Sequence, residues 1–133
     1  MSEKSTIVGK SLLAQFAIAI SKELEDRFLE FARRVRDFCR RLKWDIINTE
    51  YIKQLIKASA SVGANYIEAS DDLGKADERM KIKTARREAK ESKHFLSLVL
   101  TYDDSEGEKE RIYLVDESEQ IKKILSTIVT KLG

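Results

Sequence analysis

The sequence predicts an all-α protein, a four-helix bundle of up-down topology with a long first helix. The 133 residues include no proline and only five glycines, so few positions interrupt a helix. Charged residues make up 36% of the chain with nearly balanced signs, which is typical of a water-soluble helical protein. Apolar residues also recur every three or four positions in successive segments. A chain of this length is expected to form one hydrophobic core.

The first helix is predicted to reach about residue 42. Its apolar seam consists of Leu13, Phe16, Ile20, Leu24, Phe28, Phe31, Val35, Phe38 and Leu42. The apolar run Ser11 to Ile20 is too short to cross a bilayer. Because its periodicity continues into the body of the protein, we assign it to this helix and not to a signal peptide. We therefore expect an N-terminal extension, residues 1–22, that continues into the first helix of a bundle domain, residues 23–133.

Two further seams predict the second and third helices. The second consists of Ile47, Tyr51, Leu55, Ala58, Val62, Tyr66, Ala69 and Leu73. Gly74 offers a break, after which a helix starting near Lys75 is predicted. Its seam consists of Ile82, Ala85, Ala89, Ser92, Leu96 and Val99.

The fourth helix is predicted to follow an exposed acidic loop, Thr101 to Glu110. We expect Arg111 to Val115 to be a lead-in, because no partner for a short strand is visible, and Asp116 to cap the helix. The inward positions are Ile121, Leu125, Ile128 and Leu132.

The second helix has an unusually wide apolar arc. Beside its seam lie five further apolar or small residues: Ile52, Ile56, Ser59, Gly63 and Ile67. They would be exposed unless another helix or subunit covers them, so we predict that they form an oligomer interface. The opposite flank carries a polar stripe of Ser61, Asn65, Glu68 and Asp72. This stripe is either solvated or bonded to a basic residue of the third helix.

Part of the chain resembles a known family. The segments Gln54 to Ser70 and Arg79 to Leu96 are similar to the signature of the four-helix bundle proteins called 23S rRNA intervening-sequence proteins. The resemblance covers about Leu24 to Leu100. Its distinctive residues are Gln54, Leu55, Ser59, Ser61, Gly63, Ala64, Asn65, Glu68, Ala69, Glu88, Ala89 and Glu91. The chain departs from the family where Leu42 to Asp45 lacks the usual proline, and at Lys57, Glu78 and Phe95.

The resemblance implies a four-helix bundle without enzymatic activity. It also implies kinship with the accessory variability proteins of diversity-generating retroelements, which form pentamers that bind nucleic acid and a reverse transcriptase. A homopentamer that binds RNA or DNA is therefore one expectation. The alternative is a structural or protein-interaction scaffold, such as an accessory subunit of a reverse transcriptase, that binds no nucleic acid of its own.

Basic residues are unevenly placed in a chain whose net charge is only +2. Seven of them lie away from the apolar seams and are the predicted nucleic-acid-binding residues: Arg33, Arg36, Arg40, Lys43, Lys83, Arg87 and Lys90. In an oligomer they would repeat and neutralise several phosphates together. The competing interpretation is that they are solvated and paired with nearby acids, namely Glu30, Asp37, Glu88 and Glu91.

Catalytic and metal sites are not predicted. Glu91 and His94 have the spacing used in di-iron bundles, but His94 is the only histidine and both residues project outward. Cys39 is expected to be a buried, inert thiol, and as a single cysteine it indicates no oxidising compartment. Three aromatic residues are expected to serve packing: Trp44, Tyr66 and Phe95. The sequence thus predicts a non-catalytic cytoplasmic bundle with no cofactor, no metal and no membrane partner.

Overall fold

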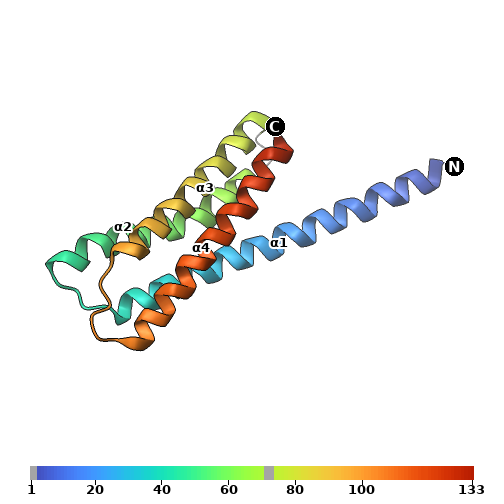
Figure 1. Ribbon diagram of the computed structural model, residues 1–133. Helices are drawn as coiled ribbons and strands as arrows, with labels where there is room; N and C mark the ends of the chain where they lie inside the picture. The colour runs from blue at the N-terminus through green and yellow to red at the C-terminus, as the bar shows by residue number, and fades with distance from the viewer. Residues whose placement is uncertain (1–2, 71–73) are drawn as a thin grey trace.

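The predicted four-helix bundle is confirmed by a computed structural model, which describes residues 3–70 and 74–133, with side chains described from residue 21 onward. The helices are α1 (Glu3–Arg41), α2 (Ile46–Ala69), α3 (Lys75–Leu98) and α4 (Ser105–Leu132). They alternate in direction, and α1 extends well beyond the other three (Figure 1). Helix α2 packs on α3, α3 on α4, and α1 on both α2 and α4, so α1 and α3 lie on a diagonal. Among the described helices, none has an apolar stretch long enough to cross a bilayer.

The predicted seams meet in a single core. Helix α1 contributes its aromatic residues, and α3 contributes small ones that allow its neighbours to approach closely. The side chains with no exposed surface include Phe28, Val35, Leu55, Val62, Ala85, Ala89, Leu96, Leu114, Ile121 and Leu125. Each of the four helices therefore has one apolar face turned inward, as the periodicity of three and four predicts.

The start of α4 differs from the prediction. The helix begins at Ser105, and the Asp104 carboxylate caps it by accepting a hydrogen bond of 3.1 Å from the Gly107 backbone N–H. The segment Arg111 to Val115 is helical, and Asp116 is an exposed residue inside the helix. Two of the acidic residues that suggested a loop, Glu106 and Glu108, lie in the first turn, where negative charge is favourable beside the unpaired N–H groups of a helix N-terminus.

Helices α1 and α4 are joined by ion pairs along their exposed edge. Three arginines of α1, spaced one heptad apart, each reach a carboxylate of α4. The pairs are Arg27 with Glu117 (Nη2 to Oε1, 2.7 Å), Arg34 with Glu110 (Nε to Oε1, 2.9 Å) and Arg41 with Asp104. The guanidinium of Arg34 also stacks 3.7 Å from the centre of the Tyr113 ring. These contacts fix the register of α1 against α4, although partly exposed pairs each add little stability.

One buried asparagine joins the two connections at the same end of the bundle. The side-chain amide of Asn48 donates hydrogen bonds of 2.9 Å to the carbonyl oxygens of Lys43 and Leu100. Its side-chain oxygen accepts a hydrogen bond of 2.8 Å from the Leu100 backbone N–H. Asn48 is fully buried, whereas Ile47, which was predicted to lie on the seam, is 51% exposed. The polar residue is buried because it satisfies backbone groups that an isoleucine would leave unpaired.

Candidate functional site

The apolar arc of α2 is narrower on the protomer surface than predicted. Ile52 has no exposed surface and Ser59 has only 2%, so helices of the same protomer, and not a second subunit, cover these two residues. Helix α1 lies close to this face, since a Cβ built on Gly63 would be 3.5 Å from the Phe28 Cβ. Ile56 and Ile67 remain 40% and 49% exposed. A surface for another subunit is therefore confined to the outer edge of the arc.

This outer edge continues into a shallow groove between α1 and α2, which we call the α1–α2 groove. It has a volume of about 290 Å³ and is lined by Leu29, Ala32, Arg33, Arg36, Ile56, Ser59 and Ala60. Leu29 is 49% exposed and was not predicted, because it lies one position off the α1 seam. Arg33 and Arg36 were predicted to bind nucleic acid, but they border the surface predicted for self-association. A subunit that covered Ile56 would also contact these two arginines.

Three of the predicted nucleic-acid-binding residues have acidic neighbours. Arg33 lies 4.0 Å from Glu30, and Arg36 forms a pair of 3.0 Å with Asp37. On α3, the Arg87 guanidinium lies 3.6 Å from the Glu88 carboxylate and 3.9 Å from the Glu91 carboxylate. The predicted pairing with nearby acids is confirmed for these three arginines. It does not prevent phosphate binding, because the side chains are more than half exposed and such pairs are weak.

The other four predicted residues form no ion pair among the described residues. They are Arg40, Lys43, Lys83 and Lys90. Lys83 and Lys90 lie on α3, which is diagonal to α1 in the bundle. The fold therefore does not bring the seven predicted residues together, and it separates the α1 group from the α3 group.

Arg40, at the end of α1, and Lys43, in the connection that follows, share this end of the bundle with two exposed aromatic residues. Trp44 is 54% exposed, and its indole N–H donates a hydrogen bond of 2.9 Å to the carbonyl oxygen of Cys39. Tyr102 is 52% exposed, and its hydroxyl donates to the Asp45 carboxylate. The ammonium of Lys43 lies 5.6 Å from the centre of the Tyr102 ring. We call Arg40, Lys43, Trp44 and Tyr102 the loop-end surface.

Both rings of the loop-end surface are held at their polar ends. The hydrogen bond from Tyr102 lowers the pKa of Asp45, and the same bond raises the pKa of the Tyr102 hydroxyl. The prediction that Trp44 is a packing residue is wrong, because it follows the last seam residue and lies in the connection between helices. The same prediction is confirmed for Tyr66, which is buried, and for Phe95, which packs against the core. The exposure of Tyr102 could not be predicted from helical periodicity, because Tyr102 lies in the connection between α3 and α4.

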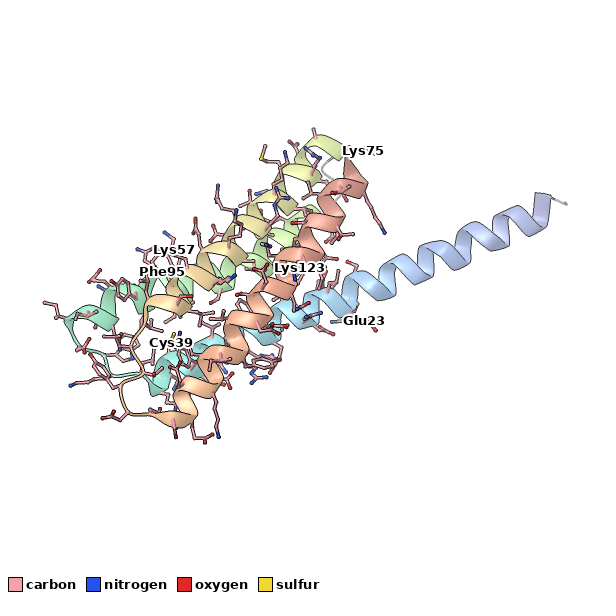
Figure 2. The ribbon with its side chains drawn as sticks, in the orientation of Figure 1. Glu23, Cys39, Lys57, Lys75, Phe95 and Lys123 are labelled. Atoms are coloured by element: carbon pink, nitrogen blue, oxygen red, sulfur yellow. The ribbon has the colours of Figure 1, made fainter. Side chains whose placement is uncertain are left out.

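The residues that suggested catalytic or metal chemistry are not grouped. Cys39 is buried on α1 near the end of the bundle that carries the loop-end surface (Figure 2), and burial raises its pKa to about 12. Glu91 and His94 are both exposed, and the His94 ring contacts the ring of Phe95 at a centroid distance of 5.2 Å. No cluster of three potential metal ligands occurs among the described residues.

The polar stripe of α2 is partly bonded to α3. The Glu68 carboxylate pairs with the ammonium of Lys81 on α3. Asn65 and Ser61 instead bond within their own helix, since the Asn65 amide donates to the Ser61 carbonyl oxygen at 2.8 Å. Asp72 lies outside the described residues, as does Leu73 of the α2 seam.

Comparisons with known proteins identify a solved structure with a similar fold. It is a crystal structure of a protein of unknown function from the S23 ribosomal protein family of Bacteroides thetaiotaomicron. The two chains are 28% identical with a TM-score of 0.68, and the match covers 80% of this chain and 97% of the other. The predicted resemblance to the intervening-sequence family is thereby confirmed. No family model matches the chain, and no curated protein matches it. The S23 neighbour thus supports the fold and the family resemblance, and it assigns no activity.

Proposed function

We propose that this protein is a non-catalytic bundle that self-associates and binds single-stranded nucleic acid at the loop-end surface. One observation carries the proposal. Two half-exposed aromatic rings are each held by a hydrogen bond at the polar end, Lys43 faces the Tyr102 ring, and neither Lys43 nor the nearby Arg40 of α1 forms an ion pair among the described residues. A flexible single strand could use both parts of this surface, because its bases stack on aromatic rings and its phosphates attract cations.

The energetics favour a single strand over a duplex. Stacking of a base on an aromatic side chain contributes about 1–3 kcal/mol, and it requires a base that is free to leave its partner. Arg40 and Lys43 would each neutralise a phosphate, so affinity falls as salt rises. No sequence preference is expected, because nothing in the surface distinguishes one base from another.

Self-association is supported by exposed apolar residues that line the α1–α2 groove or continue its edge along α2. Leu29, Ile56 and Ile67 are each at least 40% exposed, and the small residues Ala60 and Gly63 lie between the two isoleucines on α2. Such a stripe favours close approach of another helix and loses contact with water when a sister chain covers it. The resemblance to pentamer-forming proteins agrees with this surface. Each subunit would add one loop-end surface, which raises the affinity for a long strand.

The absence of catalysis is supported by the state of the reactive groups. A thiol with a pKa near 12 is protonated at neutral pH and is therefore a poor nucleophile. His94 has no carboxylate or thiol bonded to its ring among the described residues, so it lacks the partner that activates a general base.

The proposal is tested by titrating labelled single-stranded RNA, single-stranded DNA and duplex DNA with the full chain, following fluorescence anisotropy. Binding should favour the single strands and weaken about sevenfold between about 50 and about 200 mM salt, the decrease expected when one loop-end surface neutralises two phosphates of a single strand. Trp44→Ala should weaken it by roughly 5-fold to 100-fold. Its matched control is Met80→Ala, which removes an exposed apolar side chain at the opposite end of the bundle and should leave affinity unchanged.

Charge is tested by a second pair of variants. Lys43→Ala should weaken binding and reduce its salt dependence, whereas Lys75→Ala, at the far end of the bundle (Figure 2), should do neither. If Lys83→Ala weakens binding and Lys43→Ala does not, nucleic acid binds along α3 and the loop-end surface is wrong. If no strand binds at low salt, the protein is the alternative scaffold without nucleic-acid binding of its own.

A further inference from the structure

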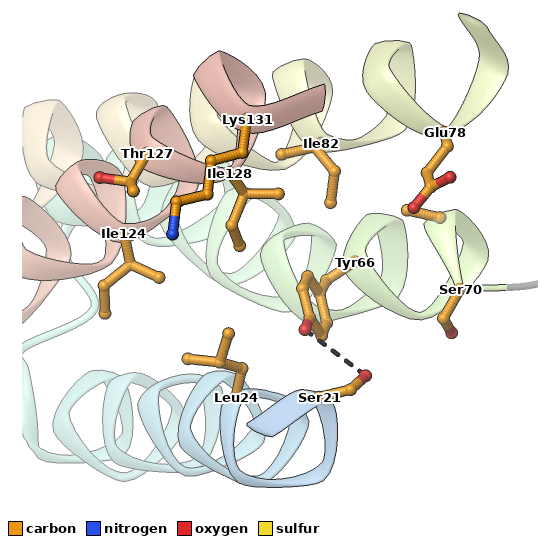
Figure 3. A pocket seen from close by; sticks show the side chains of 11 residues that line it. Ser21, Leu24, Tyr66, Ser70, Glu78, Ile82, Ile124, Thr127, Ile128 and Lys131 are labelled. Carbon is orange, nitrogen blue, oxygen red and sulfur yellow. Dashed lines mark hydrogen bonds between the residues drawn. The ribbon is translucent and has the colours of Figure 1, made fainter. Parts of the chain in front are cut away.

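A second apolar surface lies at the other end of the bundle, where α1 leaves it. It is an open hollow of about 600 Å³, which we call the open-end hollow. Six apolar side chains from all four helices line it, together with Glu78 and Lys131 among the polar residues (Figure 3). The apolar residues are Leu24, Tyr66, Ala69, Ile82, Ile124 and Ile128. Ser21 of α1 closes one side, and its hydroxyl lies 3.5 Å from the Tyr66 hydroxyl.

The hollow exists because α1 and the other three helices diverge. Helices α2, α3 and α4 continue to the end of the bundle, whereas α1 points away from them on the N-terminal side of Ser21 (Figure 1). This end of the molecule is therefore a three-helix arrangement with the place of the fourth helix vacant. Ile124 and Ile128 consequently stay only partly buried, although both face the interior. Covering such residues removes apolar surface from water and is favourable.

The N-terminal part of α1 packs on no other described helix of the protomer (Figure 1). Residues 3–20 continue α1 outside the bundle, over roughly 27 Å at 1.5 Å per residue. Its sequence places Leu13, Phe16 and Ile20 in the same register as Leu24, a core-facing residue of α1. By sequence, the stripe that packs inside the bundle thus extends through a segment that no other described helix of the protomer accompanies (Figure 1).

The two features complement each other only between molecules. Because α1 is one continuous helix from Glu3 to Arg41, residues 3–20 cannot return to the hollow of their own chain without a break. The segment contains no proline that would favour such a break, and its one glycine is Gly9, far from the point where α1 leaves the bundle. The hollow needs one amphipathic helix, and a second copy of the chain supplies one.

We propose that residues 3–20 of one protomer occupy the open-end hollow of another protomer, in the place of the missing fourth helix. This inference rests on the proposed self-association and names the segment and the receiving surface. Each protomer donates one helix and receives one, so the exchange closes either within a pair or around a ring. The exchange also gives the N-terminal extension a role, whereas self-association through the α1–α2 groove does not involve this segment.

The exchange is tested by directed disulfide formation between two different variants of the full chain. One chain carries Phe16→Cys, and the other carries Ile124→Cys together with a mass tag. Cys39 stays in place, because a buried thiol with a pKa near 12 does not compete. After the two proteins are mixed and oxidised, the mixed disulfide should be the main product. The matched control replaces Ile124→Cys by Lys123→Cys, an exposed neighbour on α4 that does not line the hollow.

Each outcome decides the proposal. A mixed disulfide with Ile124→Cys that exceeds the one with Lys123→Cys severalfold supports it. Equal yields, or only disulfides between two Phe16→Cys chains, overturn it, the latter because the extensions would then pair with each other. In a chain with both substitutions, a disulfide formed within a monomer would also overturn it, because the extension would fill its own hollow.

A further pair of variants separates this inference from the proposed self-association. Phe16→Glu should lower the mass of the assembly without changing helix content, since residue 16 lies outside the protomer's bundle. Ile67→Glu tests the exposed apolar edge of α2, which continues into the α1–α2 groove, independently. If Ile67→Glu lowers the mass while Phe16→Glu does not and no mixed disulfide forms, the helix exchange is wrong and self-association stands. If the unmodified chain is a monomer, both are wrong.

Discussion

Replacement of Asn48 by alanine tests how the two connections beside the loop-end surface are held together. The substitution removes three hydrogen bonds at once, to the Lys43 carbonyl oxygen and to both backbone groups of Leu100. Each contributes about 1 kcal/mol net, and a buried group left unpaired costs more. Alanine recovers about 0.5 kcal/mol through its better helix propensity. The expected loss of unfolding free energy is therefore about 2.5 kcal/mol.

The assay is urea unfolding followed by circular dichroism, with the slope of the transition compared between variants to confirm that the same surface unfolds. Hydrogen exchange gives a local measurement, because the Leu100 amide should lose its protection more than the core amides do. The matched control is Asn65→Ala, which removes a single bond within α2 and should change stability by less than about 0.5 kcal/mol. A loss below about 1 kcal/mol for Asn48→Ala would show that water replaces the lost bonds and that Asn48 does not hold the connections.

Three further predictions concern single sites. Gly63→Ala should raise the free energy of unfolding by about 0.5–1 kcal/mol, because its Cβ would make an ordinary contact with Phe28, whereas Gly63→Leu should lower it in the same urea assay. Cys39 should not react with a thiol reagent at pH 8 until the protein is unfolded, and rapid reaction of the native protein would contradict its burial. Arg41 holds the pKa of Asp104 at about 2, below its ordinary 3.8, so this pair stabilises the fold above about pH 4 and the contribution disappears as pH falls toward 2. In the Asp104→Asn variant the melting temperature should depend less on pH between about pH 4 and about pH 2. A pH dependence equal to that of the unmodified protein would refute the role of the pair.

The fold could be predicted from the sequence because its single core is built from apolar residues that recur periodically along long helices. The seam from Leu24 to Leu42 on α1 and the seam from Ile82 to Val99 on α3 both lie at the interior of the bundle. The start of α4 was missed because acidic residues and a glycine, typical of a loop, also suit the first turn of a helix. The inward position of Leu114 was the available signal, since it continues the α4 periodicity toward Ile121.

The candidate surfaces were harder to predict, because exposure depends on how helices pack and not on one helix alone. A helical projection of the α2 sequence cannot show that neighbouring helices bury Ile52. The apolar arc has the same width whether or not those helices cover it. Trp44 lies in a connection, where helical periodicity gives no information, and its exposure follows from a hydrogen bond to the Cys39 carbonyl oxygen. The pairing of Tyr102 with Asp45 joins residues that are far apart in the sequence. Such pairs are visible only in three dimensions.

The most direct test of self-association is the mass of the full chain in solution, measured by light scattering over a range of concentrations. The proposed interface predicts a multiple of the 15.3 kDa protomer, reduced when Ile56 and Ile67 are both replaced by glutamate. A mass of 15.3 kDa at every concentration would contradict it.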